Sequence, residues 1–119
     1  MTKSKTSELT GAALDWAVAK AIKVSVIILP IDNEAGKHQV QKCGFIEEPW
    51  WPSFDWSQCG PLIAEYLQKF EKYGSGDFFA DCGGRETCYS APTPQIAICR
   101  AVVGAKLGDE VEIPSDLIP

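Results

Sequence analysis

The stretch "PTPQIAICRAVVGAKLG", residues 92–108, carries a complete set of helix signals. Thr93 is a good N-cap, and Pro94 occupies the favoured first helical position. Side chains suited to a core recur at helical spacing along one face, with Ala97 and Ala101 beside them: Ile96, Cys99, Val103 and Leu107. Gly108 is a stop signal. The sequence therefore predicts a helix over residues 93–107 with one face in the core.

Two further helices are predicted upstream. The first spans residues 10–22, with Thr10 as N-cap and with Leu9 and Leu14 at the two positions of a hydrophobic staple. The second starts at Pro61, and Gly74 ends it. Its expected apolar face consists of Leu62, Ile63, Tyr66, Leu67 and Phe70.

The remaining apolar segments indicate strands. "KVSVIILPI" (23–31) is short and β-branched, and Pro30 would end this strand or place it at a sheet edge. Residues 32–58 are expected to form a long loop with one strand near 38–41. "DFFADCG" and "ETCYSA" flank Gly83-Gly84-Arg85 and indicate a β-hairpin. "KTSEL" is a further candidate strand, and "DEVEIP" is expected to form an edge strand or an extended tail on the core.

This order of elements predicts an α+β fold, a small two-layer sandwich of about three helices against a short, mainly antiparallel sheet. A chain of 119 residues makes one domain, residues 1–119. The net charge of −5 argues against binding to nucleic acid or to an anionic membrane. Most of that charge lies in an acidic C-terminal tail, residues 109–119. No apolar run is long enough to cross a bilayer, and the first residues are polar, so we expect a cytoplasmic protein.

Five cysteines stand at positions 43, 59, 82, 88 and 99, without a CxxC motif. In a reducing cytosol they are expected to be free thiols, several of them buried. The single histidine, His38, has no close ligand partner, so neither a metal nor a cofactor is expected. Cys59 is the best nucleophile candidate, because a helix start lowers the pKa of a thiol. Nothing places a base beside it, which favours a buried structural thiol.

The aromatic side chains gather in one Pro-rich loop: Trp50, Trp51, Phe54 and Trp56. They either close the core, which is the usual place of Trp, or form a platform for a ligand or protein. Because acidic residues surround them, an exposed set favours a protein partner over nucleic acid. Asp55 is expected to accept backbone N–H bonds near the helix start, with Trp56 anchored in the core. Arg85, at the hairpin tip, is a candidate anion contact, and Arg100 is expected to form a surface ion pair.

Three blocks of the chain resemble the bacteriophage NinX family: "KTSELTGAALDWAVAKA" (5–21), "PSFDWSQCGPLI" (52–63) and "PTPQIAICRAVVGAKLGDEVEIP" (92–114). The resemblance implies a phage or prophage accessory protein in a bacterial cytoplasm. It transfers no catalytic residue. Where family members have Gly-Gly-Pro, this chain has Cys59-Gly60-Pro61, which argues against Cys59 as a shared catalytic group. Residues 23–49 fall outside the resemblance.

These observations favour a non-enzymatic module that binds a host or phage protein, with an exposed apolar patch near residues 50–56 or on the last helix. The candidate binding residues are Trp50, Trp51, Phe54, Asp55, Trp56 and Arg85, and no catalytic residue is assigned. The alternatives are a thiol-dependent enzyme or redox sensor centred on Cys59 and a small-ligand binder that uses Arg85 and the aromatic loop.

Overall fold

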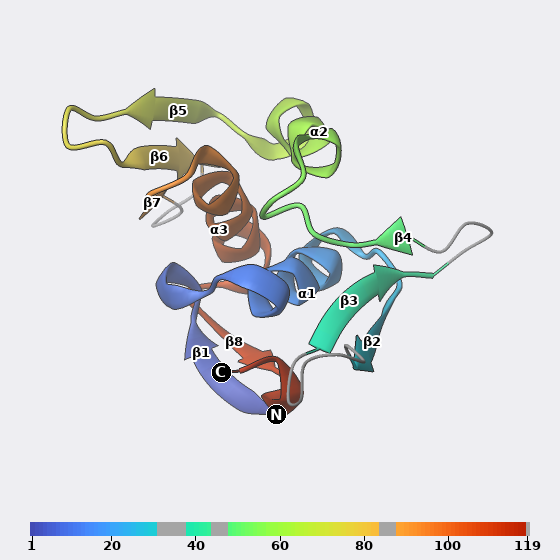
Figure 1. Cartoon of the computed structure of the whole chain (residues 1–119). Coiled ribbons are helices and arrows are strands. Elements are labelled where there is room, and N and C mark those ends of the chain that lie inside the picture. Colours follow the sequence, from blue (N-terminus) through green and yellow to red (C-terminus); the bar gives the residue numbers. More distant parts are fainter. Residues whose placement is uncertain (31–37, 44–47, 84–87, 119) are drawn as a thin grey trace.

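The structure is a computed structural model that describes residues 1–30, 38–43, 48–83 and 88–118. Its helices are α1 (Gly11–Ile22), α2 (Trp56–Tyr66) and α3 (Pro94–Leu107), with short 3-10 turns η1 (Thr6–Glu8) and η2 (Ser115–Leu117) (Figure 1). Its strands are β1 (Thr2–Lys5), β2 (Val26–Pro30), β3 (His38–Lys42), β4 (Glu48–Pro49), β5 (Lys69–Lys72), β6 (Phe78–Asp81), β7 (Cys88–Ala91) and β8 (Glu110–Ile113). The α+β class is confirmed. The strands are divided among three small antiparallel sheets, ordered β1-β8, β2-β3-β4 and β5-β6-β7.

Helix α3 lies at the centre of the core. Its start is the predicted one, because the Thr93 side chain accepts a hydrogen bond from the N–H of Ile96 at 3.3 Å. Every residue from Ala97 to Val103 is buried. Successive positions in a helix point in all directions, so this run requires neighbours on every side. These neighbours are α1, α2, β6 and β7. Helix α3 is therefore buried on more sides than the single core face that the sequence predicted.

Helix α1 and the chain ends close the core from the other side. The predicted N-cap Thr10 has extended backbone geometry, although its side chain makes no capping bond, and Lys23 ends the helix in the left-handed region at φ 62°. Strand β1 pairs with β8 from Thr2 opposite Ile113 to Lys5 opposite Glu110. The acidic end is therefore partly a sheet strand, with buried apolar residues alternating with exposed carboxylates.

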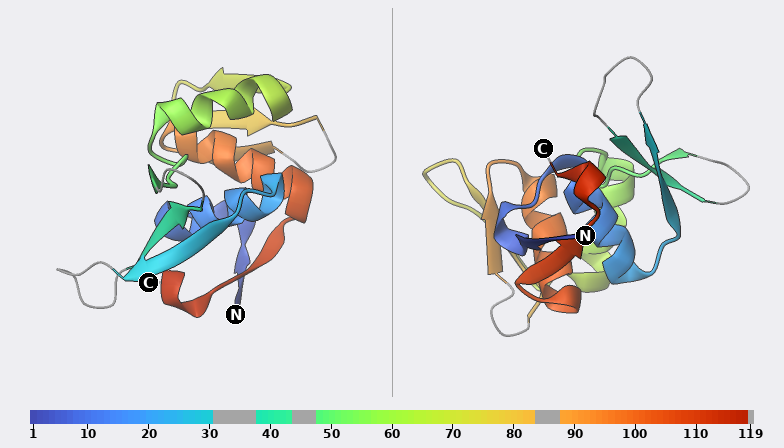
Figure 2. Two further views of the ribbon diagram at one scale, coloured as in Figure 1. Left: turned by 90° about the vertical axis from the view of Figure 1, so that its right-hand side faces the viewer. Right: turned by 90° about the horizontal axis from the view of Figure 1, so that it is seen from below.

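The β2-β3-β4 sheet has its paired core residues, Ile28 and Val40, on one face. Ile27 and Leu29 point to the other face and are exposed. Strand β2 lies at the edge of this sheet, which is one of the two outcomes predicted for Pro30. Strand β3 falls where the sequence placed it, whereas β4 is an element that the sequence did not predict. This sheet and the β5-β6-β7 sheet lie on opposite sides of the central helices (Figure 2).

Helix α2 differs from its prediction at both ends. It begins at Trp56, before Pro61, because Asp55 accepts a hydrogen bond from the N–H of Ser57 and caps the helix. It ends at Tyr66, and Lys69–Lys72 forms β5 instead of a further helical turn. Pairing with β6 outweighs the local helical pattern here, since Phe70 stacks on Phe78 with ring centroids 5.8 Å apart.

The predicted pairing of the two segments around residues 83–85 is confirmed as β6 with β7, in the register Ala80 opposite Tyr89. The hairpin tip, with Arg85, lies outside the described residues.

The prediction of a surface ion pair for Arg100 is wrong. Its side chain is buried, and its Nε and Nη1 atoms donate to the carbonyl oxygens of Leu9 at 2.9 Å and Ser90 at 2.8 Å. Burial lowers the pKa of this guanidinium. Its two hydrogen bonds link α3 to the segment before α1 and to β7.

Candidate functional site

The aromatic loop, residues 50–56, leads from β4 to the start of α2 (Figure 1). Only 6% of Trp50 is exposed, whereas Trp51, Phe54 and Trp56 expose 41%, 75% and 48%. We call these three exposed side chains the aromatic face. Within it, Trp51 and Phe54 pack edge to face with ring centroids 5.9 Å apart. The prediction that Trp56 anchors in the core is wrong, and Trp50 takes that role.

Helix α1 holds the loop through one buried residue, Asp15. The indole Nε1 of Trp50 donates to the backbone oxygen of Asp15 at 2.9 Å. The backbone N–H of Ser53 donates to the Asp15 carboxyl, also at 2.9 Å. Two consecutive parts of the loop are therefore fixed to the same helical residue, and the backbone between them carries Trp51.

Helices α2 and α3 hold the loop from the other side. The Gln58 side chain donates to the carbonyl of Pro49 at 2.7 Å and accepts from the N–H of Trp51 at 2.7 Å. The side chain of Gln95, in the first turn of α3, donates to the carbonyl of Phe54 at 3.2 Å. Backbone groups that leave water need such partners, and these bonds fix the path that presents the exposed rings.

Asp55 fulfils its predicted role at the start of α2. Its carboxylate accepts from the N–H of Ser57 at 2.9 Å and from the Ser57 hydroxyl at 2.8 Å. These bonds lower the pKa of Asp55, with a smaller contribution from the side chain of Trp51. The carboxylate thus stays ionised among the rings of the aromatic face.

Asp15 has the opposite electrostatic character, because it is buried. Desolvation raises the pKa of its carboxyl from 3.8 to about 7, and hydrogen bonds from Ser53 oppose the shift. A group with this pKa changes its charge near neutral pH. The residue that holds the aromatic loop is therefore also one that can respond to pH.

Cys59 is buried in α2, inside the helix rather than before it. The neighbouring Cys99 thiol lowers the pKa of Cys59, while burial and the charge of Asp15 raise it. The hydrogen bond with the Cys59 thiol, together with burial, holds the pKa of Cys99 well above its ordinary value. The structure thus pairs Cys59 with Cys99 and Asp15, and places His38, the base considered from the sequence, at the start of β3.

Three residues of the site were missed by sequence reasoning: Asp15, Gln58 and Gln95. A signal existed for Asp15, since it interrupts the apolar stripe of "ALDWAVA" at a position that faces the core. A carboxyl on such a stripe needs a partner, and the partner is the aromatic loop. The two glutamines carry no comparable signal, because Gln is common on exposed helix faces.

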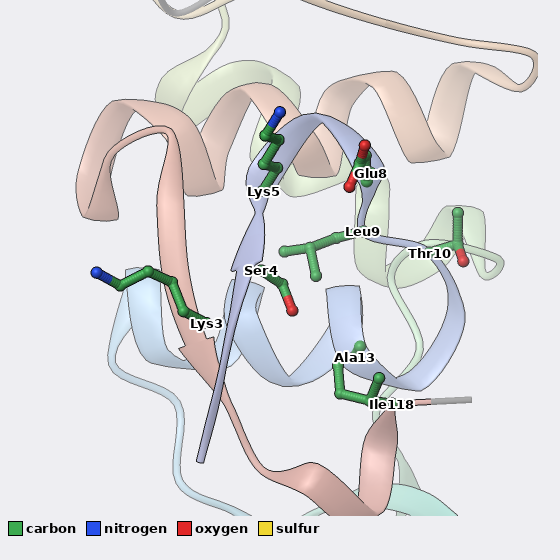
Figure 3. A pocket seen from close by; sticks show the side chains of 8 residues that line it. All are labelled: Lys3, Ser4, Lys5, Glu8, Leu9, Thr10, Ala13 and Ile118. Carbon is green, nitrogen blue, oxygen red and sulfur yellow. The ribbon is translucent and has the colours of Figure 1, made fainter.

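A hollow of about 410 Å³ near the N-terminus has no residue of the aromatic loop in its lining (Figure 3). Its lining residues are Lys3, Ser4, Lys5, Glu8, Leu9, Thr10, Ala13 and Ile118. Figure 3 shows the ammonium groups of Lys3 and Lys5 pointing in different directions, so they do not converge on one ligand. The small-ligand alternative gains no support from this hollow, and Arg85 lies outside the described residues.

Over the described ranges, no helix has the length and apolarity needed to span a membrane. Nor do three His, Cys, Asp or Glu side chains of that part of the chain gather into a group able to hold a metal ion.

A search of curated proteins finds no match. A family model described as "Bacteriophage P22, NinX" matches residues 5–106 of the 119 residues, a range that includes the aromatic loop and all three helices up to Lys106. The chain therefore belongs to the bacteriophage P22 NinX family and is a phage-type accessory protein.

Proposed function

We propose that this protein is a non-enzymatic interaction module that binds a host or phage protein through the aromatic face. The observation that carries the proposal is the exposure of Trp51, Phe54 and Trp56 in one short loop. Trp is enriched among the residues that dominate binding energy in protein interfaces. The net charge of −5 favours a protein over nucleic acid as the partner.

The fastening of the loop supports the same proposal. Binding is weakened when a loop must be ordered at the moment of association. Here the side chains of Asp15, Gln58 and Gln95 already hold the backbone of the loop. The rings are presented in advance, at little further entropic cost. The proposal includes a bacterial cytoplasmic location, which the family assignment and the free cysteines support.

The test is a pull-down from nuclease-treated bacterial lysate, with and without phage infection, read by mass spectrometry. The variant Trp51→Ala/Phe54→Ala removes two exposed rings and leaves the buried Trp50 in place. We expect it to lose at least about tenfold of the partner signal, because interface hot spots contribute 2 kcal/mol or more.

The matched control is Tyr73→Ala, which removes an exposed ring from the β5–β6 turn, outside the aromatic loop. It should retain the partner. If both variants retain every partner that the native chain captures, or if the native chain captures none, the aromatic face is not the functional surface.

A second candidate is a peroxide sensor built on Cys59, favoured by the pairing of its thiol with Cys99. The thiolate of Cys59 would attack hydrogen peroxide, releasing hydroxide and leaving a sulfenic acid. The Cys99 thiol would then attack that sulfur, forming a disulfide and releasing water. Together, two thiols and one peroxide give one disulfide and two waters. Burial restricts the reaction to small oxidants.

The test uses a variant in which Cys43, Cys82 and Cys88 are replaced by Ser. With peroxide, its intact mass should fall by two hydrogen atoms, and the disulfide should raise the free energy of unfolding by about 4 kcal/mol. Adding Cys99→Ser should abolish that mass loss. An unchanged mass, or a gain of oxygen without loss of hydrogen, would rule out the sensor.

A further inference from the structure

The segment that carries the aromatic face has acidic side chains and no basic one. Residues 43–68 contain no Lys, Arg or His, while four carboxylates fall in the same segment: Glu47, Glu48, Asp55 and Glu65. Of the three that the structure describes, Glu48 and Glu65 are exposed and Asp55 lies at the aromatic face. Basic residues lie beside both ends of this segment. Lys42 is opposite Glu48 in the β3–β4 ladder, and Nζ of Lys106 lies 5.2 Å from the ring centroid of Tyr66.

Asp55 combines its charge with the aromatic rings. Its carboxylate accepts from Ser57, and the side chain of Trp51 also interacts with it. The two residues that flank Asp55 in the chain, Phe54 and Trp56, are both exposed. A carboxylate beside exposed aromatic rings offers a cation both charge and ring faces, and Trp is the ring with the strongest attraction for a cation.

Pro61 adds a hydrogen-bond acceptor next to Trp56. A proline inside a helix has no N–H to donate to the carbonyl four residues before it, which here is that of Ser57. Ser57 is an exposed residue in the first turn of α2, and its carbonyl oxygen lacks the i+4 donor of a regular helix. The start of the helix therefore carries a carboxylate, and a carbonyl without its regular helical donor, beside a Trp ring.

An open space beside Gly60 lies on the same helix as these acceptors. Trp56, Gly60 and Ile63 lie at spacings of four and three residues, so they share one side of α2. Trp56 and Ile63 are exposed, and a Cβ atom built on Gly60 would meet nothing within 4 Å. An apolar side chain of a partner can lie over Gly60, between the two larger residues.

We propose that the aromatic face binds an arginine-bearing, basic segment of a partner protein, in which apolar side chains flank the arginine. The inference rests on the proposed function and specifies its partner. The guanidinium would stack on a ring of the face and donate to Asp55 and to the Ser57 carbonyl, while a neighbouring apolar side chain lies over Gly60. Arginine fits better than lysine, because its planar fork both stacks and donates several hydrogen bonds.

The test measures three labelled peptides by fluorescence anisotropy against the full chain. They alternate Leu with Arg, Leu with Lys or Leu with Glu. We expect the Arg peptide to bind about tenfold more tightly than the Glu peptide and severalfold more tightly than the Lys peptide. Its binding should weaken as NaCl is raised, since exposed charges are screened.

Asp55→Asn removes the charge and keeps a capping side chain. It should lower the affinity for the Arg peptide severalfold and make that affinity less dependent on the NaCl concentration. The matched control, Asp116→Asn, removes one exposed carboxylate from η2, at the opposite end of the molecule, and should change neither (Figure 1).

Equal binding of the Arg and Glu peptides, no binding of any peptide, or equal effects of the two charge variants would each overturn the inference. The proposed function is decided separately, by whether Trp51→Ala/Phe54→Ala loses its partner from lysate. A partner lost in that variant but unaffected by Asp55→Asn and by salt would keep the function and refute the basic segment.

Discussion

Replacing Gly104 by Ala is expected to lower the free energy of unfolding by about 3 kcal/mol, the upper part of the range for overpacking. Gly104 lies in α3, directly beneath the ring of Tyr89 in β7. A Cβ atom at this position would lie 2.2 Å from one ring carbon and 2.6 Å from the hydroxyl oxygen. Tyr89 is itself buried, so its ring cannot move into solvent. The β5-β6-β7 sheet must shift away from α3 instead.

The measurement is urea denaturation followed by circular dichroism, with the free energy taken from the linear extrapolation. Gly60→Ala is the matched control, because Gly60 is also helical and its added Cβ meets no atom within 4 Å. This control should be neutral or stabilising by about 0.5–1 kcal/mol, through the helix preference for Ala. Equal losses in the two variants would show that the contact with Tyr89 does not determine the effect.

Asp15→Asn is expected to stabilise the protein at pH 8 and to leave it nearly unchanged at pH 4. The pKa of Asp15 is raised from 3.8 to about 7 in the folded chain. Between these values the folded state binds the proton more tightly than the unfolded state, so native stability falls as pH rises from about 4 to 7. At 1.36 kcal/mol per pH unit, the cost of ionising the buried group approaches about 4 kcal/mol above pH 7.

Asn removes that cost and still offers an oxygen to the N–H of Ser53. The decisive quantity is the difference in unfolding free energy between variant and native chain, measured from pH 4 to pH 8. It should grow with pH and level off near pH 8. Asp15→Ala is the control that removes the acceptor as well as the charge, and its free energy of unfolding at pH 8 should rise less than that of Asp15→Asn. A difference that stays constant with pH would contradict the raised pKa.

Sequence alone determined the features that depend on contacts between residues close together in the chain. The starts of α1 and α3, the capping role of Asp55 and the β6–β7 pairing follow from such local signals. Caps and turns act within a few residues, so their chemistry can be recognised without the fold. The three family blocks are likewise a property of the sequence, and the match over residues 5–106 agrees with them.

The tertiary structure decided what depends on residues far apart in the chain. Trp50 is buried and Trp56 exposed because Asp15, on another helix, binds one part of the aromatic loop and not the other. Arg100 is buried because Leu9 and Ser90 offer it carbonyl oxygens from two other segments. The pKa of Asp15 follows from the same packing. Burial and charge arise from neighbours that folding brings together, and one-dimensional spacing does not encode which neighbours those are.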